Sequence, residues 1–531
     1  MSLIQHGIRV GLLMAGATFL FTWLNYHSEV TFADGLRYIK QAERIEKGAW
    51  SEGLVRSVDH PVHPIAIATV HRIFGGEGPV SWQRAAQVVA IASCVLLVIP
   101  LYMLGLEMFG PTAAWLGTLL FIANPILAFV VINVLSESTF LFFWTMGLWA
   151  ALRFLREGKF LWLPLTIAFG AVAYLARPEG LLLPLTLVVT LLLLPLHWST
   201  RIHWPRWWAA VGFMVIGPLL LVGPYIASKG GLGTKPSIAR LIGTTPASAP
   251  QALERERPLS ADQTVLETYR QSTRRMWKVV RTSVSTPLLA AAVLGIFAVR
   301  PWSSRAQVWL FLTIMLAASA VGLIRLHATG GYCTVRHAMI PCLLLTMAAA
   351  NGLSWLMQSV VIPGKWFGRG EERFKLGPAV WAVVLAALVV TPHVKAMTPF
   401  GGSFAAYRDA GDWLAQETAD KPGKVLDLTN WALYFSDKPG LQFADIHDAR
   451  WDPNTRWVVV RGAHLRGRWN YIPLVKELIG NREPIMVIPP HAAPKQIQLR
   501  IYDRSMPKPE AVAAKPAPPT RAGGPSEPLK R

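Results

Sequence analysis

Residues 84–109 read RAAQVVAIASCVLLVIPLYMLGLEMF, and no charged side chain interrupts the run between Arg84 and Glu107. A helix crosses the hydrocarbon core of a bilayer with about 20 apolar residues, so this run predicts a transmembrane helix. Comparable runs recur along the chain and predict about eleven spans of this kind. They lie near residues 9–25, 84–109, 112–131, 135–154, 160–176, 181–198, 207–227, 284–299, 306–325, 337–359 and 377–397.

The composition also indicates a polytopic α-helical membrane protein. Of the 531 residues, 52% are hydrophobic and only 16% are charged, whereas about 25% of residues are charged in a typical soluble domain. This excludes an ordinary soluble enzyme and a disordered chain. The 22 Trp fit a bilayer, because indole rings collect at its interfaces. The first span keeps its small residues inside the apolar run, so it is predicted to be a retained anchor and not a cleaved signal peptide.

The distribution of basic residues predicts the topology. Lys and Arg gather in one set of short loops, at 153–159, 201–206, 300–305 and 365–375. Cytoplasmic loops carry the Lys/Arg excess, so these loops are expected to face the cytoplasm. Much of the net charge of +21 is then a topological signal and not a nucleic-acid footprint. The long connections 27–83 and 228–283 are placed on the extracytoplasmic side.

The organisation changes after the last predicted span. Residues 1–400 form the predicted membrane domain, and residues 403–505 resemble a small extracytoplasmic α/β domain. Helices are predicted over 405–417 and 471–479, and strands over 425–428, 457–460 and 485–488. Residues 506–531 are rich in Pro, Ala and Lys and are expected to be disordered.

Polar residues converge on the predicted outer surface of the membrane domain. Ionisable residues at membrane depth are costly and therefore indicate function. Separate pieces of chain supply the candidates at the outer ends of spans and in the first outer segment: Asp34, His60, His63, Glu137, Arg177, Glu179, Arg336 and His337.

The segment that begins with Thr31 predicts an amphipathic helix in the interface. Leu36, Ile39, Ala42 and Ile45 recur at helical spacing with charged residues between them, a pattern of helices that lie flat on a membrane. Asp34 stands at the start of this helix. It is either a capping residue or a catalytic carboxylate, and the sequence leaves both roles open.

The next motif is Asp59-His60-Pro61-Val62-His63-Pro64. Pro64 suits the first turn of a helix, whose free N–H groups could bind a phosphate with help from the two imidazoles. A metal site is the alternative, although Pro61 disfavours chelation from one helix face. Neither role is decided by the sequence.

The order of these motifs resembles the type-C glycosyltransferase superfamily, which includes protein O-mannosyltransferases and lipid A aminoarabinose transferases. The resemblance covers roughly residues 1–360. It rests on Asp34 with Tyr38 four residues on, the His-Pro-x-x-Pro turn, Ser136-Glu137, Ala176-Arg177-Pro178-Glu179-Gly180 and Arg336…Pro341. The resemblance implies a polyprenyl-phosphate sugar donor, with Asp34 as the catalytic carboxylate and Tyr38 beside the substrate. Members of the family often carry paired acids where this chain has Asp34-Gly35, so Glu137 is the candidate second carboxylate.

The residue types suit this chemistry. Phosphate leaves a sugar as a stable anion, so one carboxylate that accepts the proton of the acceptor hydroxyl is sufficient. Cations must stabilise the departing phosphate. Arg177 and Arg336 are the candidate phosphate clamps, and the alternative for Arg177 is a structural ion pair with Glu137 or Glu179. Attack opposite the phosphate predicts inversion at the anomeric carbon.

A second outer helix carries a basic face. Arg270, Arg274 and Lys278 recur every four residues, followed by Arg281. They are predicted either to recruit an anionic lipid head group to the site or merely to rest on anionic lipid.

The favoured function is transfer of a sugar from a polyprenyl-phosphate donor to an extracytoplasmic acceptor, a glycan, lipid or protein. No cofactor is expected to be required, and a divalent metal stays an open alternative. A transporter or flippase of lipid-linked sugars is the second class considered, and it would place charged or broken positions at mid-membrane. A membrane metallohydrolase built on Asp59, His60, His63 and His71 is the third.

Overall fold

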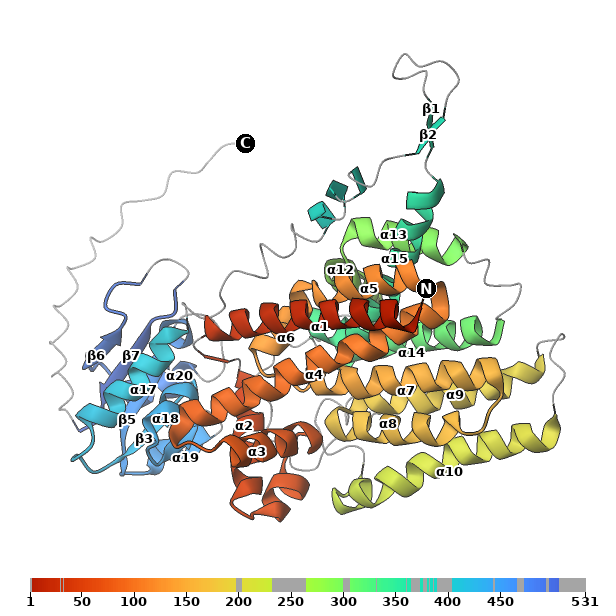
Figure 1. Cartoon of the computed structure of the whole chain (residues 1–531). Helices are drawn as coiled ribbons and strands as arrows, with labels where there is room; N and C mark the ends of the chain where they lie inside the picture. The colour runs from red at the N-terminus through yellow and green to blue at the C-terminus, as the bar shows by residue number, and fades with distance from the viewer. Residues whose placement is uncertain are drawn as a thin grey trace, which may run out of the picture. The chain divides into compact units, whose positions relative to one another are not determined.

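The computed structural model describes residues 2–28, 30–31, 33–196, 203–231, 264–298, 306–330, 332–359, 361–363, 373–375, 380–381, 383–384, 386–388, 404–442, 445–465, 472–492 and 496–505. It divides into two compact units, Met1–Ala405 and Ala406–Arg531 (Figure 1).

The first unit is helical. Its N-terminal half contains α1 (Leu3–Tyr26), α2 (Ala33–Glu46), η1 (Ser51–Arg56), α3 (Val62–Phe74), α4 (Gly78–Phe109), α5 (Pro111–Ile122), α6 (Pro125–Ile132), α7 (Glu137–Glu157) and α8 (Trp162–Ala176). After these come η2 (Pro178–Leu181), α9 (Leu182–Leu193), η3 (Leu194–Leu196), α10 (Trp204–Ser228), α12 (Val265–Val284), α13 (Thr286–Ala298), α14 (Ala306–Gly330), η5 (Val335–Ala338), α15 (Met339–Ser359) and the short strands β1 (Val361–Pro363) and β2 (Arg373–Lys375).

The polytopic membrane fold predicted from the sequence is confirmed, but the count of eleven spans is not. Within the described ranges, seven helices are long and apolar enough to cross a bilayer, or nine if two bent pairs each count as one span. The predicted span 160–176 corresponds to α8, which is apolar but short. Most of the predicted span 377–397 lies outside the described residues, as does the tail 506–531.

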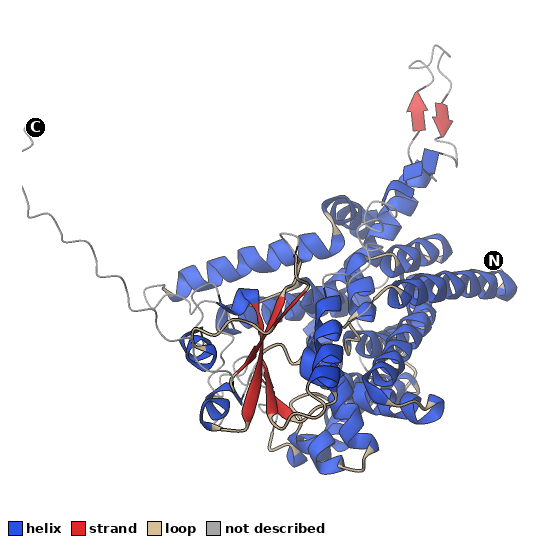
Figure 2. Cartoon of the chain, turned by 90° about the vertical axis from the view of Figure 1, so that its left-hand side faces the viewer, coloured by secondary structure: helices blue, strands red, loops and turns tan. Residues whose placement is uncertain are grey.

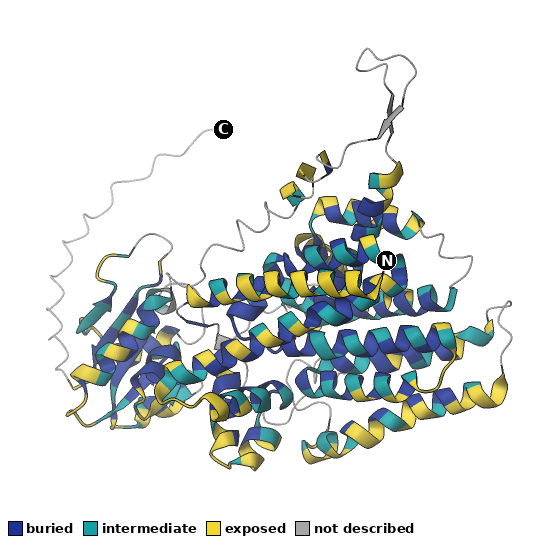
Figure 3. Ribbon diagram, viewed as in Figure 1, coloured by how far each residue is buried: buried dark blue, intermediate teal, exposed yellow. Residues whose placement is uncertain are grey.

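Burial separates central helices from peripheral ones (Figure 3). In α7 and α15, 72% and 78% of the residues in the apolar window are buried, against 22% in α1 and 28% in α10. The close crossing of α13 and α15 depends on glycine. A Cβ atom at Gly295 would lie 1.9 Å from the carbonyl oxygen of Ala348. Small residues at such crossings let two helix backbones approach closely, as is common in membrane bundles.

The helices α2 and α12 are amphipathic, as predicted. In α2 the four apolar positions Leu36, Ile39, Ala42 and Ile45 are all buried. The axis of α12 makes an angle of 91° with that of α13, and the chain turns between them at Ser285, which has φ +71°. If α13 crosses the bilayer, α12 therefore lies along its surface.

The second unit is an α/β domain around one five-stranded sheet, drawn in red in Figure 2. Its elements are α17 (Ala405–Glu417), β3 (Lys424–Asp427), α18 (Trp431–Ser436), β4 (Gly440–Gln442), α19 (Ile446–Trp451), β5 (Thr455–Arg461), η8 (Gly462–Leu465), α20 (Ile472–Ile479), β6 (Met486–Ile488) and β7 (Leu499–Asp503). The strand order is β4-β3-β5-β7-β6. β3 pairs in parallel with β4 and β5, and β7 is antiparallel to β5 and β6. The central strand β5 has a nearly continuous buried run, as expected of a strand covered on both faces.

Candidate functional site

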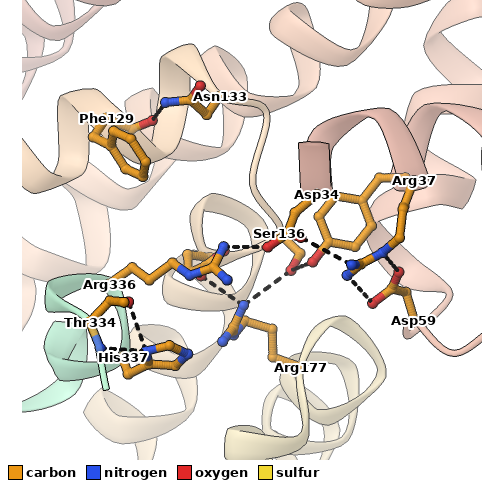
Figure 4. Close-up of polar contacts among 12 residues, drawn as sticks. Asp34, Arg37, Asp59, Phe129, Asn133, Ser136, Arg177, Thr334, Arg336 and His337 are labelled. Atoms are coloured by element: carbon orange, nitrogen blue, oxygen red, sulfur yellow. Dashed lines mark hydrogen bonds and ion pairs between the residues drawn. The ribbon is translucent and has the colours of Figure 1, made fainter. Parts of the chain in front are cut away.

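Polar side chains from distant segments meet at one end of the helical unit (Figure 4). Asp34 lies in the first turn of α2, Glu137 begins α7 and Arg177 ends α8. Glu179 follows in η2, and Arg336 lies in η5, which leads into α15. The convergence expected from the sequence is thus present in the structure as direct contacts.

Asp34 is held between two guanidinium groups. Its Oδ2 lies 2.5 Å from Nη1 of Arg336, and its Oδ1 lies 3.0 Å from Nη1 of Arg37. Burial raises the pKa of the Asp34 carboxyl, but Arg37 and Arg336 outweigh burial and hold this pKa below its ordinary value. The side chain is therefore ionised at neutral pH, as a general base must be.

The capping alternative for Asp34 is not what the structure shows. Helix α2 begins at Ala33, so Asp34 stands within the first turn, and both carboxylate oxygens contact arginines. A negative charge at this position is favoured by the helix dipole.

The glycine after Asp34 is required by packing. A Cβ atom at Gly35 would lie 2.5 Å from the carbonyl oxygen of Asn133, too close for any other residue. The second acid that the family resemblance implies next to Asp34 therefore cannot stand here unless the backbone moves.

Two charged residues of the cluster were missed by sequence reasoning. Arg37 donates to Asp59 through Nε, 2.9 Å from Oδ2, and through Nη2, 3.2 Å from Oδ1. The Asp59 side chain is only 4% exposed. Arg37 stands three residues after Asp34, one helical turn away, which was the available signal. Asp59 had been considered only as a possible metal ligand.

Arg177 makes the structural ion pairs considered as its alternative role. Its Nη1 lies 2.8 Å from Oε1 of Glu137, and its Nη2 lies 2.7 Å from Oε1 of Glu179. Glu137 is 2% exposed, and among the described residues its carboxylate makes ion pairs but no hydrogen bond of good geometry. Oε1 of Glu137 is also 4.0 Å from Nε of Arg336. Glu137 therefore stands between two arginines.

Tyr38 is buried beneath this cluster. Its hydroxyl accepts a hydrogen bond of 3.0 Å from Oγ of Ser136, and its ring meets the ring of His63 edge to face. Burial raises the pKa of Tyr38 well above its ordinary value, and the nearby carboxylates of Asp59 and Glu137 add to this. Tyr38 thus enters the site as a neutral hydroxyl.

The two histidines of the His-Pro motif have different partners. Both ring nitrogens of His63 contact the protein, Nδ1 with Thr139 at 2.8 Å and Nε2 with the carbonyl of Val134 at 3.2 Å. Burial lowers the pKa of His63 to about 4, so this ring carries no charge at neutral pH. The His60 ring packs edge to face on Tyr174, with ring centres 5.0 Å apart.

His337 completes the arginine-bearing turn. Its Nδ1 accepts a hydrogen bond of 3.2 Å from the backbone N–H of Thr334 and lies 2.9 Å from the Thr334 hydroxyl. These bonds fix the short helix η5 from which Arg336 reaches Asp34.

The basic face of α12 is exposed. Arg270, Arg274, Lys278 and Arg281 are all solvent-accessible, while Val279 and Val280 are buried on the opposite face. Trp277 is 56% exposed on this helix.

The described residues contain no group of three or more His, Cys, Asp or Glu side chains arranged to hold a metal ion. His71, one of the ligands considered for a metallohydrolase, instead contacts the carboxylate of Glu46 and the hydroxyl of Ser81 and stacks on Trp82. The three cysteines are buried and free.

The chain is similar to known glycosyltransferases in sequence and in fold. A family model described as dolichyl-phosphate-mannose-protein mannosyltransferase matches residues 59–221, a segment that includes Asp59, Glu137, Arg177 and Glu179. No curated protein matches the sequence.

Solved structures share the fold at low identity. The apo oligosaccharyltransferase of Archaeoglobus fulgidus gives a TM-score of 0.58 at 12% identity and covers 89% of this chain and 72% of its own. ArnT from Cupriavidus metallidurans, bound to undecaprenyl phosphate, gives 0.55 at 14% identity over 93% of this chain and 97% of its own. The arabinofuranosyltransferase AftD from Mycobacteria gives 0.50 at 12% identity over 95% and 42%. The predicted resemblance is confirmed: this is an integral membrane protein with the fold of the type-C glycosyltransferases.

Proposed function

We propose that this protein is a membrane glycosyltransferase that moves a sugar from a polyprenyl-phosphate donor to an extracytoplasmic acceptor, which is a glycan, a lipid or a protein. The observation that carries the proposal is the contact of Asp34 with Arg336, 302 positions apart in the chain. It unites a candidate base with a candidate phosphate ligand at one end of the bundle. Relatives of the same fold bind such lipids: undecaprenyl phosphate in ArnT and dolichol-phosphate in the archaeal AglB.

The chemistry follows from the leaving group. In the proposed reaction Asp34 takes the proton of the acceptor hydroxyl, the acceptor oxygen bonds to the anomeric carbon, and the bond from that carbon to the phosphate oxygen breaks. Its electron pair stays on the phosphate, which needs no proton at neutral pH. The arginines neutralise this charge, so the step needs no cofactor. Attack from the face opposite the phosphate inverts the anomeric configuration.

The charge balance restricts how the phosphate can bind. The carboxylates of Asp34, Asp59, Glu137 and Glu179 outnumber the guanidinium groups of Arg37, Arg177 and Arg336 by one. A phosphate therefore has to compete with a carboxylate for its arginine. We assign the main phosphate contact to Arg336, because Arg177 has two close ion pairs, at 2.8 and 2.7 Å, whereas Arg336 has one close pair with Asp34 and a longer contact of 4.0 Å with Glu137.

The remaining site residues receive supporting roles in this proposal. Glu137, predicted as a second catalytic carboxylate, is too deeply buried to meet an acceptor, so it orients Arg177 and Arg336. Tyr38 and His63 pack against each other below the protein surface and support Ser136, which precedes Glu137. His337 fixes the turn that carries Arg336. His60, whose ring packs edge to face on Tyr174, is the histidine that we assign to contact with the substrate. Glu179 holds Arg177 through their ion pair of 2.7 Å.

The basic face of α12 is proposed to gather anionic lipid head groups, the donor phosphate among them. A basic helix with exposed aromatic residues, lying along the membrane surface, suits this role. Replacement of Arg270, Arg274, Lys278 and Arg281 by Gln should raise the KM for donor. The control is Arg44→Gln in the last turn of α2 with Lys47→Gln just after this helix. If the donor kinetics are unchanged, α12 contacts anionic lipid but takes no part in donor binding.

The extracytoplasmic location is tested by labelling. The natural cysteines are buried, so a membrane-impermeant maleimide should report single cysteines introduced at exposed positions. Glu52→Cys should react from outside intact cells and Lys159→Cys only after lysis. The reverse result would invert the topology and contradict the proposed side of the reaction.

The most direct test of the donor class is mass spectrometry of lipids that co-purify with the protein. The proposal predicts a polyprenyl monophosphate or its sugar ester, depleted in Arg336→Gln protein. Enrichment of bilayer phospholipids alone would contradict it.

A further inference from the structure

Arg37 connects Asp34 to the buried carboxylate of Asp59. The Asp59 carboxylate is almost fully buried and accepts two hydrogen bonds from the Arg37 fork, at 2.9 and 3.2 Å. Planar two-bond contacts of this kind restrict the orientation of a guanidinium group. Of the Arg37 nitrogens, Nη1 remains for Asp34 and lies 3.0 Å from Oδ1.

The opposite side of Asp34 is held differently. Nη1 of Arg336 contacts Oδ2 of Asp34, and Nε of Arg336 lies 4.0 Å from Oε1 of Glu137. It comes from η5, a different part of the chain from Arg37 and Asp59. One carboxylate oxygen of Asp34 is therefore held by an arginine that a buried carboxylate orients through two hydrogen bonds at 2.9 and 3.2 Å. The other oxygen is held by Arg336, whose contact with its buried acid Glu137 is longer, at 4.0 Å.

We propose that Asp59 and Arg37 are positioning residues that keep Oδ1 of Asp34 in place, while the donor phosphate takes Arg336 away from Oδ2 and so frees this oxygen to act as the base. The inference rests on the proposed function and specifies how the same site is used. Asp59 and Arg37 touch neither donor nor acceptor in this account. They act through Asp34.

The exchange couples donor binding to activation of the base. While Arg336 contacts Oδ2, two cations stabilise the Asp34 carboxylate and weaken it as a base. When the phosphate accepts Arg336, one cation is left, and Oδ2 can accept the proton of the acceptor hydroxyl. Arg37 still prevents rotation of the carboxylate, and displacement of a reacting group by about 1 Å can cost roughly 10²-fold in rate.

A purely structural role for Arg37 and Asp59 makes a different prediction. The pair would then only tie α2 to the loop before α3. That connection is also made by Gln41 of α2, whose Nε2 donates to the carbonyl of Asp59 at 3.4 Å and to that of Gly53 in η1 at 2.6 Å. Loss of the ion pair should therefore leave the fold in place, and its effect on rate can be measured in folded protein.

The test compares Arg37→Gln, Arg37→Lys and Asp59→Asn with Arg56→Gln, an exposed arginine of the same segment, as the matched control. The proposal predicts that Arg37→Gln and Asp59→Asn lower kcat by about 10²-fold with less than about threefold change in the KM for donor. Binding of polyprenyl phosphate should be retained, because Arg336 is intact. Arg37→Lys should recover part of kcat, since a single cation can still reach Oδ1. Arg336→Gln should show the opposite pattern, with KM rising more than kcat falls.

Wild-type kcat in Arg37→Gln, or a loss confined to KM, would overturn the proposal. If Asp59→Asn does not fold, Arg37→Gln carries the test, because its side chain is 53% exposed and its removal leaves no cavity in the core. If the wild-type protein transfers no sugar from any polyprenyl-phosphate donor, the proposed function itself has failed. If it does transfer sugar and the Arg37 variants equal the control, only the positioning role has failed.

Discussion

Asp34→Asn separates the base from the phosphate ligand in a single substitution. The amide keeps the shape of the side chain and its contact with Arg37 but cannot accept the acceptor proton. Loss of a general base costs about 10²–10⁴-fold in rate, or about 2.7–5.4 kcal/mol in activation free energy. We expect kcat to fall by this amount.

The same change should strengthen phosphate binding. Asp34 and Arg336 are 15% and 22% exposed, and ion pairs with partial exposure contribute up to about 1 kcal/mol. Removal of the competing carboxylate frees Arg336 from this pair, so the affinity for polyprenyl phosphate should rise by up to about fivefold.

The assay uses purified protein in nanodiscs. Polyprenyl-phosphate binding is measured by tryptophan fluorescence or calorimetry, and single-turnover transfer is followed with the donor that mass spectrometry identifies. Glu52→Gln, an exposed acid of the same outer segment, is the control and should match the wild type in both measurements. A transfer rate in Asp34→Asn within tenfold of wild type, or a loss of phosphate binding, would refute the assignment of Asp34 as base and as competitor for Arg336.

Four further outcomes are expected. In the free enzyme two arginines hold the pKa of Asp34 below its ordinary value, so kcat/KM, which reports the free enzyme, should not decline as the pH falls to the ordinary range of an aspartate, about 4; a decline of kcat/KM that begins above about pH 5.5 would assign the base elsewhere. Gly35→Ala should lower kcat, because its Cβ meets the carbonyl of Asn133 and displaces the turn of α2 that carries Asp34; enzyme assay of the fraction that remains monodisperse in size-exclusion chromatography checks this. Gly295→Ala should destabilise the bundle by about 1–3 kcal/mol through the clash with Ala348, seen as a lower Tm in detergent and not as a changed KM. Prolonged EDTA treatment should leave the transfer rate unchanged, and rescue of a lost rate by one divalent ion would show that the arginines are not sufficient.

The local patterns of the sequence were sufficient for much of the fold. The apolar stripe of α2 is buried as predicted, and α17 has the predicted bounds of Ala405–Glu417. The strands β4 and β7 were missed. β4 has only three residues, too few for a pattern to show. Ile497, Leu499 and Ile501 alternate with polar residues at β7, and this period of two was the available signal for a strand.

The candidate site was predictable as a region but not as a set of contacts. The alternation of spans predicted Asp34 and Arg336 at the same membrane surface, because the two ends of a spanning helix lie on opposite sides of the bilayer. Their pairing depends on how α2 and η5 pack, which no local pattern encodes. Asp59 shows the same limit, since the fork from Arg37 joins residues 22 positions apart. Arg37 and Asp59 can be recognised in the sequence as charged residues, but only the tertiary structure shows that they are partners.

The central claim is most directly tested by the fate of the lipid carrier. Purified protein is incubated with its polyprenyl-phosphate sugar and membrane-derived acceptors, and the lipid products are separated by mass. The account predicts that free polyprenyl monophosphate appears in step with sugar on the acceptor, and that Asp34→Asn protein produces neither. If the sugar stays on its lipid while the lipid itself changes leaflet in sealed vesicles, the protein is a flippase and the account is contradicted.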